Sequence, residues 1–267
     1  MASIALTIAG SDSGGGAGVQ ADMKAMSALG VYAASAVTAI TAQNTRGVFA
    51  VEDLSAKIVA SQIRAVLDDF AVGAVKIGML SSSTLVETVA DALAGYDGPV
   101  VLDPVMVAKS GDALLRDDAV AALTRRLLPR ASVLTPNLPE AARLLGGDQA
   151  ETDDEMLDQG EALRALGPRA VLMKGGHGAG DDCVDFLVST GAPAVAFRAR
   201  RIATKNTHGT GCTLSSAIAA GLAKGLDLTQ ATGEAHAYLQ AAIAQADALA
   251  VGGGAGPVHH FHAHWAP

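Results

Sequence analysis

Short apolar runs alternate with segments of helical periodicity along nearly the whole chain. Strands are predicted at 4–9, 33–41, 74–77, 99–102, 132–134 and 170–173. Helices, in which apolar residues recur every three or four positions, are predicted at 19–26, 58–67, 83–93, 117–128, 139–145 and 153–166. Repeated strand–helix–strand units of this kind predict an α/β fold, with a mostly parallel central sheet and helices on both of its faces.

The last third of the chain departs from this alternation. Two strands are predicted at 184–188 and 194–197, joined as an antiparallel hairpin. Two Ala-rich helices are expected after them, at 213–224 and 229–249. No internal repeat or low-complexity linker divides the sequence, so we expect a single domain over residues 1–267.

The composition argues against several classes of partner. The formal net charge is −8 and aromatic residues make up 3%, which disfavours a nucleic-acid-binding protein. The uncharged stretch 25–45 is interrupted by Ser, Thr, Gln, Asn and Gly, so it does not predict a membrane span. The N-terminus shows no secretion signal, and two cysteines do not make a disulfide scaffold. We therefore expect a reduced, cytoplasmic protein without nucleic-acid or membrane partners.

A glycine-rich loop, residues 10–18, follows the first predicted strand. Its five glycines allow the backbone to approach a ligand closely, and their N–H groups can hold polar atoms; a flexible turn is the alternative. The loop matches neither G-x-x-x-x-G-K-[ST] nor G-x-G-x-x-G, so neither nucleotide-binding motif is present. Asp22 follows one turn into the next helix, where an acidic residue ordinarily pairs with the helix dipole.

The segment 206–213, Asn-Thr-His-Gly-Thr-Gly-Cys-Thr, carries the strongest signal of function. Glycines and small polar residues open a helix there, and the first N–H groups of a helix have no helical partners. This pattern predicts an anion hole for a phosphate, or for charge that develops on one. Cys212 lies at this positive helix end, where the pKa of a thiol falls, although a free Cys is more often a small buried apolar residue.

Charged residues lie close to the ends of other predicted strands. Asp103 ends one strand and Glu140 follows another. Two carboxylates beside a phosphate cradle suit Mg²⁺, although each alone is more often a cap or a surface charge. Lys174 ends a further strand and Lys205 precedes the anion hole. Either lysine could neutralise a phosphate, or be a solvated surface side chain.

Four of the seven histidines lie in the last nine residues, 259–267. A metal site is the less favoured interpretation, because no Cys or acidic ligand accompanies them at structural-zinc spacing. For His208 and His236 we expect packing or capping roles at helices.

Eight segments carry distinctive motifs, among them Ala-Gly-Ser-Asp-Ser-Gly-Gly-Gly-Ala-Gly, which opens 9–22, and Gly-Pro-Val-His-His-Phe-His at 256–262. The others lie at 41–45, 76–80, 102–106, 135–141, 172–177 and 206–212. In this order, and over essentially the whole chain, they resemble the hydroxymethylpyrimidine/phosphomethylpyrimidine kinases of thiamine biosynthesis. The motifs are very specific in combination, although several of them singly are not.

The resemblance implies a ribokinase-like fold and ATP-dependent phosphoryl transfer with Mg²⁺, in a homodimer. Such kinases phosphorylate 4-amino-5-hydroxymethyl-2-methylpyrimidine, and then convert the monophosphate to the diphosphate. A pyridoxine/pyridoxal kinase of the same fold is the alternative enzyme, which Gln43 followed by Asn44 and Thr45 disfavours. A pyrimidine-sensing module without turnover is the alternative from a different class.

The resemblance also implies where the pyrimidine and the metal would bind. Gln43 would read the aminopyrimidine edge, because its amide carries both a donor and an acceptor. The same pocket would be lined by Gly10, Ala17, Asp22, Met79 and Val105. Asn137 and Glu140 match the family's N-x-x-E element near Mg²⁺, and Asp103 is the second candidate carboxylate.

The remaining expected roles concern the nucleotide and the transfer itself. Contacts to the nucleotide phosphates are expected from Lys174, Lys205, Thr207 and Thr210. Gly209 and Gly211 would form the anion hole. Cys212 stands where sugar kinases of this fold usually carry an Asp as general base, so Cys212 is the candidate base here.

Overall fold

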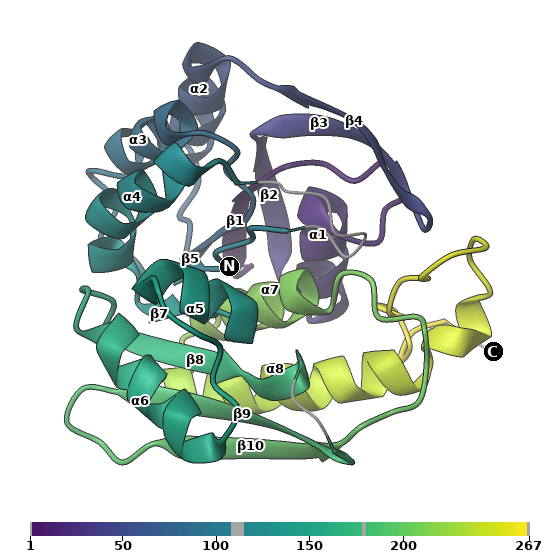
Figure 1. Cartoon of the computed structure of the whole chain (residues 1–267). Helices are drawn as coiled ribbons and strands as arrows, with labels where there is room; N and C mark the ends of the chain where they lie inside the picture. Colours follow the sequence, from purple (N-terminus) through teal and green to yellow (C-terminus); the bar gives the residue numbers. More distant parts are fainter. Residues whose placement is uncertain (1, 108–114, 178–179, 266–267) are drawn as a thin grey trace.

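The computed structural model describes residues 2–107, 115–177 and 180–265. Its centre is an eight-stranded sheet (Figure 1). In sheet order the strands are β10 (Val195–Arg200), β9 (Asp182–Ser189), β8 (Ala170–Lys174), β7 (Val133–Leu134), β6 (Val100–Leu102), β5 (Ala74–Ile77), β1 (Ile4–Ala9) and β2 (Tyr32–Val37). The strands from β8 to β2 pair in parallel, whereas β9 and β10 form an antiparallel edge. The predicted parallel sheet and the predicted hairpin are confirmed.

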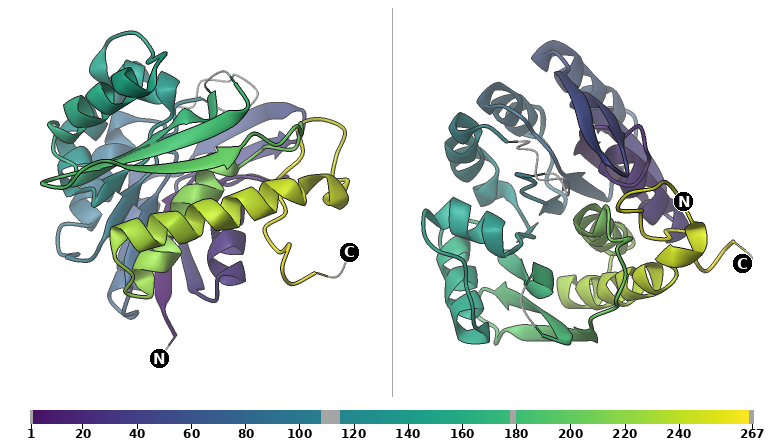
Figure 2. Two further views of the ribbon diagram at one scale, coloured as in Figure 1. Left: turned by 90° about the horizontal axis from the view of Figure 1, so that it is seen from below. Right: turned by 45° about the vertical axis from the view of Figure 1, so that its right-hand side comes forward.

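Helices cover both faces of the sheet (Figures 1 and 2). One face carries α2 (Ala56–Leu67), α3 (Ser83–Ala92), α4 (Asp117–Arg126), α5 (Leu138–Leu145) and α6 (Asp153–Arg164). The other carries α1 (Gly18–Ala28), α7 (Thr210–Ala223) and α8 (Leu228–Ala244). Alternate side chains of β1 enter different layers, since Leu6 and Ile8 pack in the first layer and Ala5 in the second.

The order of the strands places the ligand-binding edge of the sheet. The sheet grows from β1 to β2 on one side and then from β1 to β5 on the other. In open parallel sheets, ligands bind beyond the carboxyl ends of the strands, at such a reversal. The loops that follow β1, β5 and β6 open at this edge, and they contain five candidate site residues: Gly10, Ala17, Met79, Asp103 and Val105.

The single strand predicted at 33–41 is wrong. It is divided into β2 and β3 (Ala39–Asn44), and β3 pairs in antiparallel fashion with β4 (Gly47–Asp53) outside the main sheet. Thr38 marks the division, because its N–H donates to the Ala9 carbonyl and its hydroxyl donates to the Met79 carbonyl, both at 2.9 Å. No Gly or Pro interrupts the apolar run, so the break depends on these long-range bonds and has no local signal.

The helix predicted at 229–249 is too long. Helix α8 ends at Ala244, and a 3₁₀ turn, η3, covers Ala246–Leu249. The carbonyl of Ala242 accepts the N–H of His259 at 3.0 Å, so the C-terminal segment packs over the end of this helix. Within the described parts of the chain, no helix has both the length and the apolar character that a membrane span needs.

Candidate active site

The glycine-rich loop is held in shape by the carboxylate of Asp12. This carboxylate accepts the backbone N–H groups of Gly14, Gly16 and Ala17, at 2.8, 2.9 and 2.8 Å. Two of the glycine N–H groups expected to hold a ligand, those of Gly14 and Gly16, are therefore bound within the protein. The prediction of an open N–H cradle is wrong at these two positions, because the loop supplies its own anion.

Helix α7 begins directly beside this loop. Gly209 precedes the helix with φ of 80°, and a Cβ there would lie 1.8 Å from the carbonyl oxygen of Gly16, so only glycine fits. No side chain among the described residues caps α7, which leaves its first N–H groups for a ligand. A Cβ at Gly211 would lie 3.3 Å from Nζ of Lys174 and 3.6 Å from Oδ2 of Asp103. The open helix end therefore faces this Lys–Asp pair.

Asp103, Glu140 and Lys174 come together at the carboxyl edge of the sheet. Nζ of Lys174 lies 3.0 Å from Oδ1 of Asp103 and 3.9 Å from Oε2 of Glu140. The hydroxyl of Thr135 also donates to Asp103 at 3.2 Å, and Oγ of Ser215 lies 3.3 Å from Oδ2 of Asp103. Glu140 forms a capping box at the start of α5, where its carboxylate accepts an N–H group of the backbone. Two of the residue types predicted for this edge, the carboxylates and the lysine, are thus in contact.

The two carboxylates titrate in opposite directions. Burial by itself raises the pKa of Asp103, but the positive charges of Lys174 and Lys76 bring this pKa below its usual value. Burial raises the pKa of Glu140 to about 7, and the negative charge of Asp103 adds to this rise while Lys174 opposes it. Asp103 is therefore the permanent anion of the cluster, and Glu140 can take up a proton near neutral pH.

The donor set of this cluster fits Mg²⁺. This ion prefers carboxylate oxygens, retains several waters, and usually binds through one or two carboxylates together with substrate phosphates. Asp103 and Glu140 supply two carboxylates, and the N–H groups at the start of α7 lie beside them. In the described residues, no group of three or more His, Cys, Asp or Glu is arranged to hold a metal ion. The cluster thus suits an ion that arrives with a nucleotide better than a permanent structural metal.

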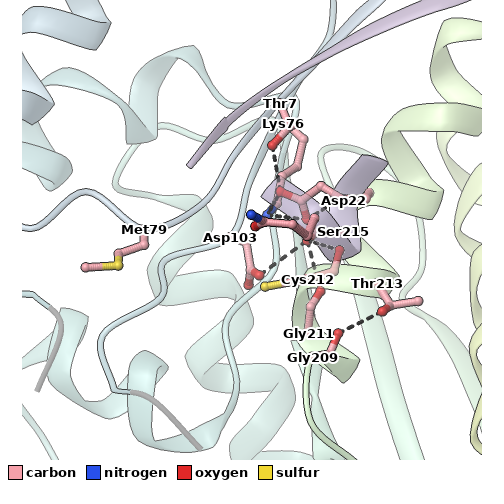
Figure 3. Close-up of polar contacts among 12 residues, drawn as sticks. Thr7, Asp22, Lys76, Met79, Asp103, Gly209, Gly211, Cys212, Thr213 and Ser215 are labelled. Carbon is pink, nitrogen blue, oxygen red and sulfur yellow. Dashed lines mark hydrogen bonds and ion pairs between the residues drawn. The ribbon is translucent and has the colours of Figure 1, made fainter. Parts of the chain in front are cut away.

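A second Asp–Lys pair lies deeper in the protein (Figure 3). Asp22 and Lys76 are both fully buried, and Nζ of Lys76 lies 2.9 and 2.8 Å from the two carboxylate oxygens. The hydroxyls of Thr7 and Ser216 also donate to Asp22, at 2.6 and 2.7 Å. The dipole role considered for Asp22 is wrong, because its carboxylate is turned to these three partners. No role was expected for Lys76, although a lone Lys in an apolar strand is a signal of a buried charge that needs a partner.

Cys212 lies between the two ion pairs, and its thiol is a weak acid. Figure 3 shows its sulfur near Asp103. Desolvation by the surrounding protein raises the pKa of Cys212 to about 11; Lys76 and the N–H of Gly18 oppose this rise, whereas Asp22 and Asp103 add to it. The lowered pKa expected at a helix N-terminus is therefore wrong. Burial beside two carboxylates outweighs the helix end.

Gln43 borders a cavity of about 370 Å³. Residues 43–47, His208, Gly254 and Ala255 line it. One terminal atom of the Gln43 amide lies 3.3 Å from Nε2 of His208, and the other lies 3.2 Å from Oγ1 of Thr41. The cavity therefore offers an amide and an imidazole to a ligand.

The other residues expected in the substrate pocket lie at the same edge of the sheet. Gly10 follows β1 and Met79 follows β5, and a Cβ at Gly10 would lie 3.0 Å from Sδ of Met79. Ala17 and Val105, from the loops after β1 and β6, are half-buried. Asp22 differs from this group, because it is fully buried behind them.

The residues expected at the nucleotide differ in their surroundings. Lys174 is largely buried in the carboxylate cluster, with 13% of its side chain exposed. Lys205 is exposed, and no ion pair joins it to the cluster within the described chain. Thr207 and Thr210 are half-buried and flank Gly209 at the start of α7.

The histidines have three different roles. The ring of His208 is buried against the glycine-rich loop, as its expected packing role requires, but it does not cap α7, and its Nε2 lies 2.9 Å from Oδ2 of Asp12. The ring of His236 lies 6.0 Å from that of Phe197, which is a packing contact. In the C-terminal segment, burial lowers the pKa of His260 to about 3. This ring is therefore neutral at physiological pH.

Comparison with known proteins identifies the family. The family model described as phosphomethylpyrimidine kinase matches residues 12–259. A hydroxymethylpyrimidine/phosphomethylpyrimidine kinase of Rhizobium meliloti is 59% identical over 265 residues, which are 99% of each chain. The crystal structure of phosphomethylpyrimidine kinase from Clostridium difficile is 46% identical, with a TM-score of 0.80 over 90% of this chain and 99% of that one. An ADP complex of Bacillus subtilis pyridoxal kinase is 35% identical, with a TM-score of 0.91 over 100% of both. The chain therefore belongs to the phosphomethylpyrimidine kinase family, and its fold is the ribokinase-like α/β fold of these vitamin kinases.

Proposed function

We propose that this chain transfers a phosphoryl group from ATP to the hydroxymethyl group of 4-amino-5-hydroxymethyl-2-methylpyrimidine, and then a second one to the resulting monophosphate. The observation that carries the proposal is the position of Gly211. The open end of α7 faces Lys174 and Asp103 there, so that uncapped helix N–H groups, a positive charge and a carboxylate share one edge of the sheet, as a phosphate site would require. Membership of the family supports the choice of substrate.

Phosphoryl transfer depends mainly on positioning and on stabilisation of charge, because its transition state is loose. The N–H groups around Gly209 and Gly211 would hold the transferred group. Lys174, together with Lys205, Thr207 and Thr210, would contact the nucleotide phosphates. Asp103 and Glu140 would hold Mg²⁺, which when bound neutralises phosphate oxygens.

The two acceptors make different demands on a base. The alcohol of the first step must lose a proton, whereas the monophosphate of the second step is already anionic near neutral pH. Cys212 would accept the proton of the alcohol, and only its thiolate form can do so. Because the pKa of Cys212 is about 11, the first step would be the more sensitive to pH and to replacement of this residue.

An assay of ADP release with hydroxymethylpyrimidine, its monophosphate and pyridoxal tests the proposal. We expect turnover of both pyrimidines and slower turnover of pyridoxal. Turnover of pyridoxal alone would indicate a pyridoxal kinase. Binding of the pyrimidine without ADP release would indicate a sensing module.

We also propose a homodimer in the cytoplasm. The β3–β4 hairpin exposes Ile40, Phe49 and Val51 to 50, 68 and 44%, and apolar groups of this kind mark interaction surfaces. Both cysteines are free thiols, as expected in a reducing compartment. Sedimentation of the wild type and of Phe49→Glu tests the dimer: we expect a dimer for the first and a monomer for the second, and a wild-type monomer would contradict it.

A further inference from the structure

Polar side chains from distant parts of the sequence meet beside the cavity that Gln43 and His208 line. Nε2 of His208 lies 2.9 Å from Oδ2 of Asp12 and 3.3 Å from Nε2 of Gln43. Oε1 of Gln43 lies 3.2 Å from Oγ1 of Thr41. The positions of the protons on His208 and Thr41 determine whether the oxygen or the NH₂ group of the Gln43 amide faces each of them.

The position of His208 is closely determined. Its backbone N–H donates to the carbonyl of Gly256 at 3.0 Å, and its ring approaches the glycine-rich loop so closely that a Cβ at Gly16 would lie 2.5 Å from Cδ2 of the imidazole. The side chain is buried, with 7% exposed. The C-terminal segment and the glycine-rich loop therefore hold this ring from two sides.

Asp12 determines which nitrogen of His208 carries a proton. Burial by itself raises the pKa of Asp12, but the hydrogen bond from His208 and the bonds from backbone N–H groups bring it below its usual value. An ionised carboxylate only accepts hydrogen bonds. Nε2 of His208 must therefore carry a proton, which it donates to Asp12 and can share only with an acceptor on the Gln43 side.

Thr41 determines which group is favoured at the other end of the Gln43 amide. Its hydroxyl donates to the carbonyl of Ser11 at 2.8 Å, and a hydroxyl has a single proton. Toward Gln43, Oγ1 of Thr41 can therefore only accept. The two ends of an amide are told apart by such partners.

We infer that His208, held by Asp12, is a positioning residue that orients the Gln43 amide with its oxygen toward the imidazole N–H and its NH₂ group toward Thr41. In the orientation described above, with Nε2 of Gln43 toward His208, an NH₂ group faces the imidazole N–H, and the amide oxygen faces a hydroxyl oxygen whose proton is already donated. A half-turn of the amide places an acceptor opposite the imidazole N–H and a donor opposite the Thr41 oxygen.

The orientation has a consequence for specificity, which rests on the proposed function. The amide retains one free acceptor position on the His208 side and one free N–H on the Thr41 side. The free acceptor position can bind the amino group of a 4-aminopyrimidine, and the free N–H can donate to the adjacent ring nitrogen. Only one orientation of the amide allows both bonds to a ring held in one position. A 4-oxo ring has a carbonyl and a ring N–H in the same places. Its carbonyl oxygen would face the amide oxygen, and its ring N–H would face the amide N–H, so neither pair could form a hydrogen bond.

The kinetic test compares kcat/KM for hydroxymethylpyrimidine with that for its 4-oxo analogue. Removing the imidazole donor in His208→Phe frees the amide to turn, and we expect the preference for the amino substrate to fall at least tenfold while KM for ATP changes little. His208→Gln retains an N–H donor and should keep most of the preference. His236→Phe, at a packing position, is the control and should change none of these values. Equal losses for both substrates in His208→Phe would overturn the inference.

Nitrogen NMR of histidine-labelled, ligand-free protein tests the arrangement without any substrate. The signal that His208→Gln removes should show a protonated Nε2, and Asp12→Asn should shift it. An Nε2 without a proton would overturn the inference whatever the kinetics show. If the wild type does not phosphorylate the aminopyrimidine, the proposed function fails, and the NMR result alone then decides the inference.

Discussion

The two Asp–Lys pairs of the site are chemically alike but differ in what surrounds them. The Asp22–Lys76 pair has no exposed surface, and its carboxylate also accepts hydrogen bonds from Thr7 and Ser216. The Asp103–Lys174 pair keeps 13% of its lysine exposed and has Glu140 3.9 Å from the lysine. The first pair joins β1, α1, β5 and α7; the second lies at the open end of α7.

This difference in surroundings distinguishes a pair that stabilises the fold from a pair that can interact with a ligand. A buried ion pair whose remaining bonds are all satisfied has no capacity for a ligand, although loss of one partner leaves an uncompensated charge. A pair at the edge of the sheet, with a third charge beside it, can exchange partners when a phosphate or a cation arrives. We therefore expect the two pairs to respond oppositely to the same substitution.

Replacement of Lys76 should cause the largest loss of stability. Lys76→Met leaves the carboxylate of Asp22 buried without its cation, which should lower the free energy of unfolding by about 3–5 kcal/mol. Urea denaturation measures this loss. The double variant Asp22→Asn/Lys76→Met removes both charges and should recover part of the stability. If Lys76→Met were as stable as the wild type, the Asp22–Lys76 pair would not be needed for the stability of the fold.

Replacement of Lys174 should mainly reduce catalysis. Lys174→Met removes a charge that faces the proposed phosphate site, and loss of one such electrostatic contact typically lowers kcat by about 10²–10³-fold. Its effect on stability should be smaller than that of Lys76→Met, because Glu140, with a pKa of about 7, can take up a proton and relieve its repulsion with Asp103. Steady-state kinetics and urea denaturation on the same preparation check both parts. If Lys174→Met lost more stability than activity, the Asp103–Lys174 pair would have a structural role and not the catalytic role expected here.

Cys212 lies between the pairs, and its replacement should distinguish the two phosphorylation steps. Cys212→Ala should slow phosphorylation of the alcohol by about 10²-fold, within the range for general-base catalysis, and affect the monophosphate much less. Because the pKa of Cys212 is about 11, the thiolate fraction grows as pH rises toward that value. In the wild type, kcat/KM for the alcohol should therefore rise from pH 7 to pH 9 while that for the monophosphate stays nearly level. Equal losses in both steps would assign Cys212 a packing role.

Replacement of Glu140 should weaken the response to Mg²⁺. Glu140→Gln keeps the shape of the side chain but loses its charge, and we expect the Mg²⁺ concentration needed for half-maximal activity to rise about 10–100-fold. Glu155→Gln is the matched control, since Glu155 occupies the same position in the capping box of α6 and is exposed. Gln also serves at this position of a capping box, so both variants should keep the start of their helix, and the control should keep the Mg²⁺ response of the wild type. If Glu140→Gln and Glu155→Gln needed the same Mg²⁺ concentration for half-maximal activity, Glu140 would not be a ligand of the metal.

Much of the architecture could be predicted from local patterns. The periodicity of 74–77, 99–102 and 170–173 is that of buried strands, and these strands pair in parallel as expected. The division of 33–41 into β2 and β3 was not predicted, since no Gly or Pro interrupts this run and the break at Thr38 depends on bonds to Ala9 and Met79. Local sequence does not contain such distant partners.

For the site, the sequence by itself determined which residue types gather at the carboxyl edge of the sheet: Asp103, Glu140, Lys174 and the glycines that open α7. Strand ends and helix starts are properties of a few neighbouring residues, so their motifs are visible in the chain. Only the tertiary structure decided the charge state and the partner of each group. Lys76 meets Asp22 across 54 positions of sequence, and His208 meets Asp12 across 196. Burial among such partners raises the pKa of Cys212 where its local sequence predicts a fall, because desolvation depends on everything packed around an atom and not on the residues that precede and follow it.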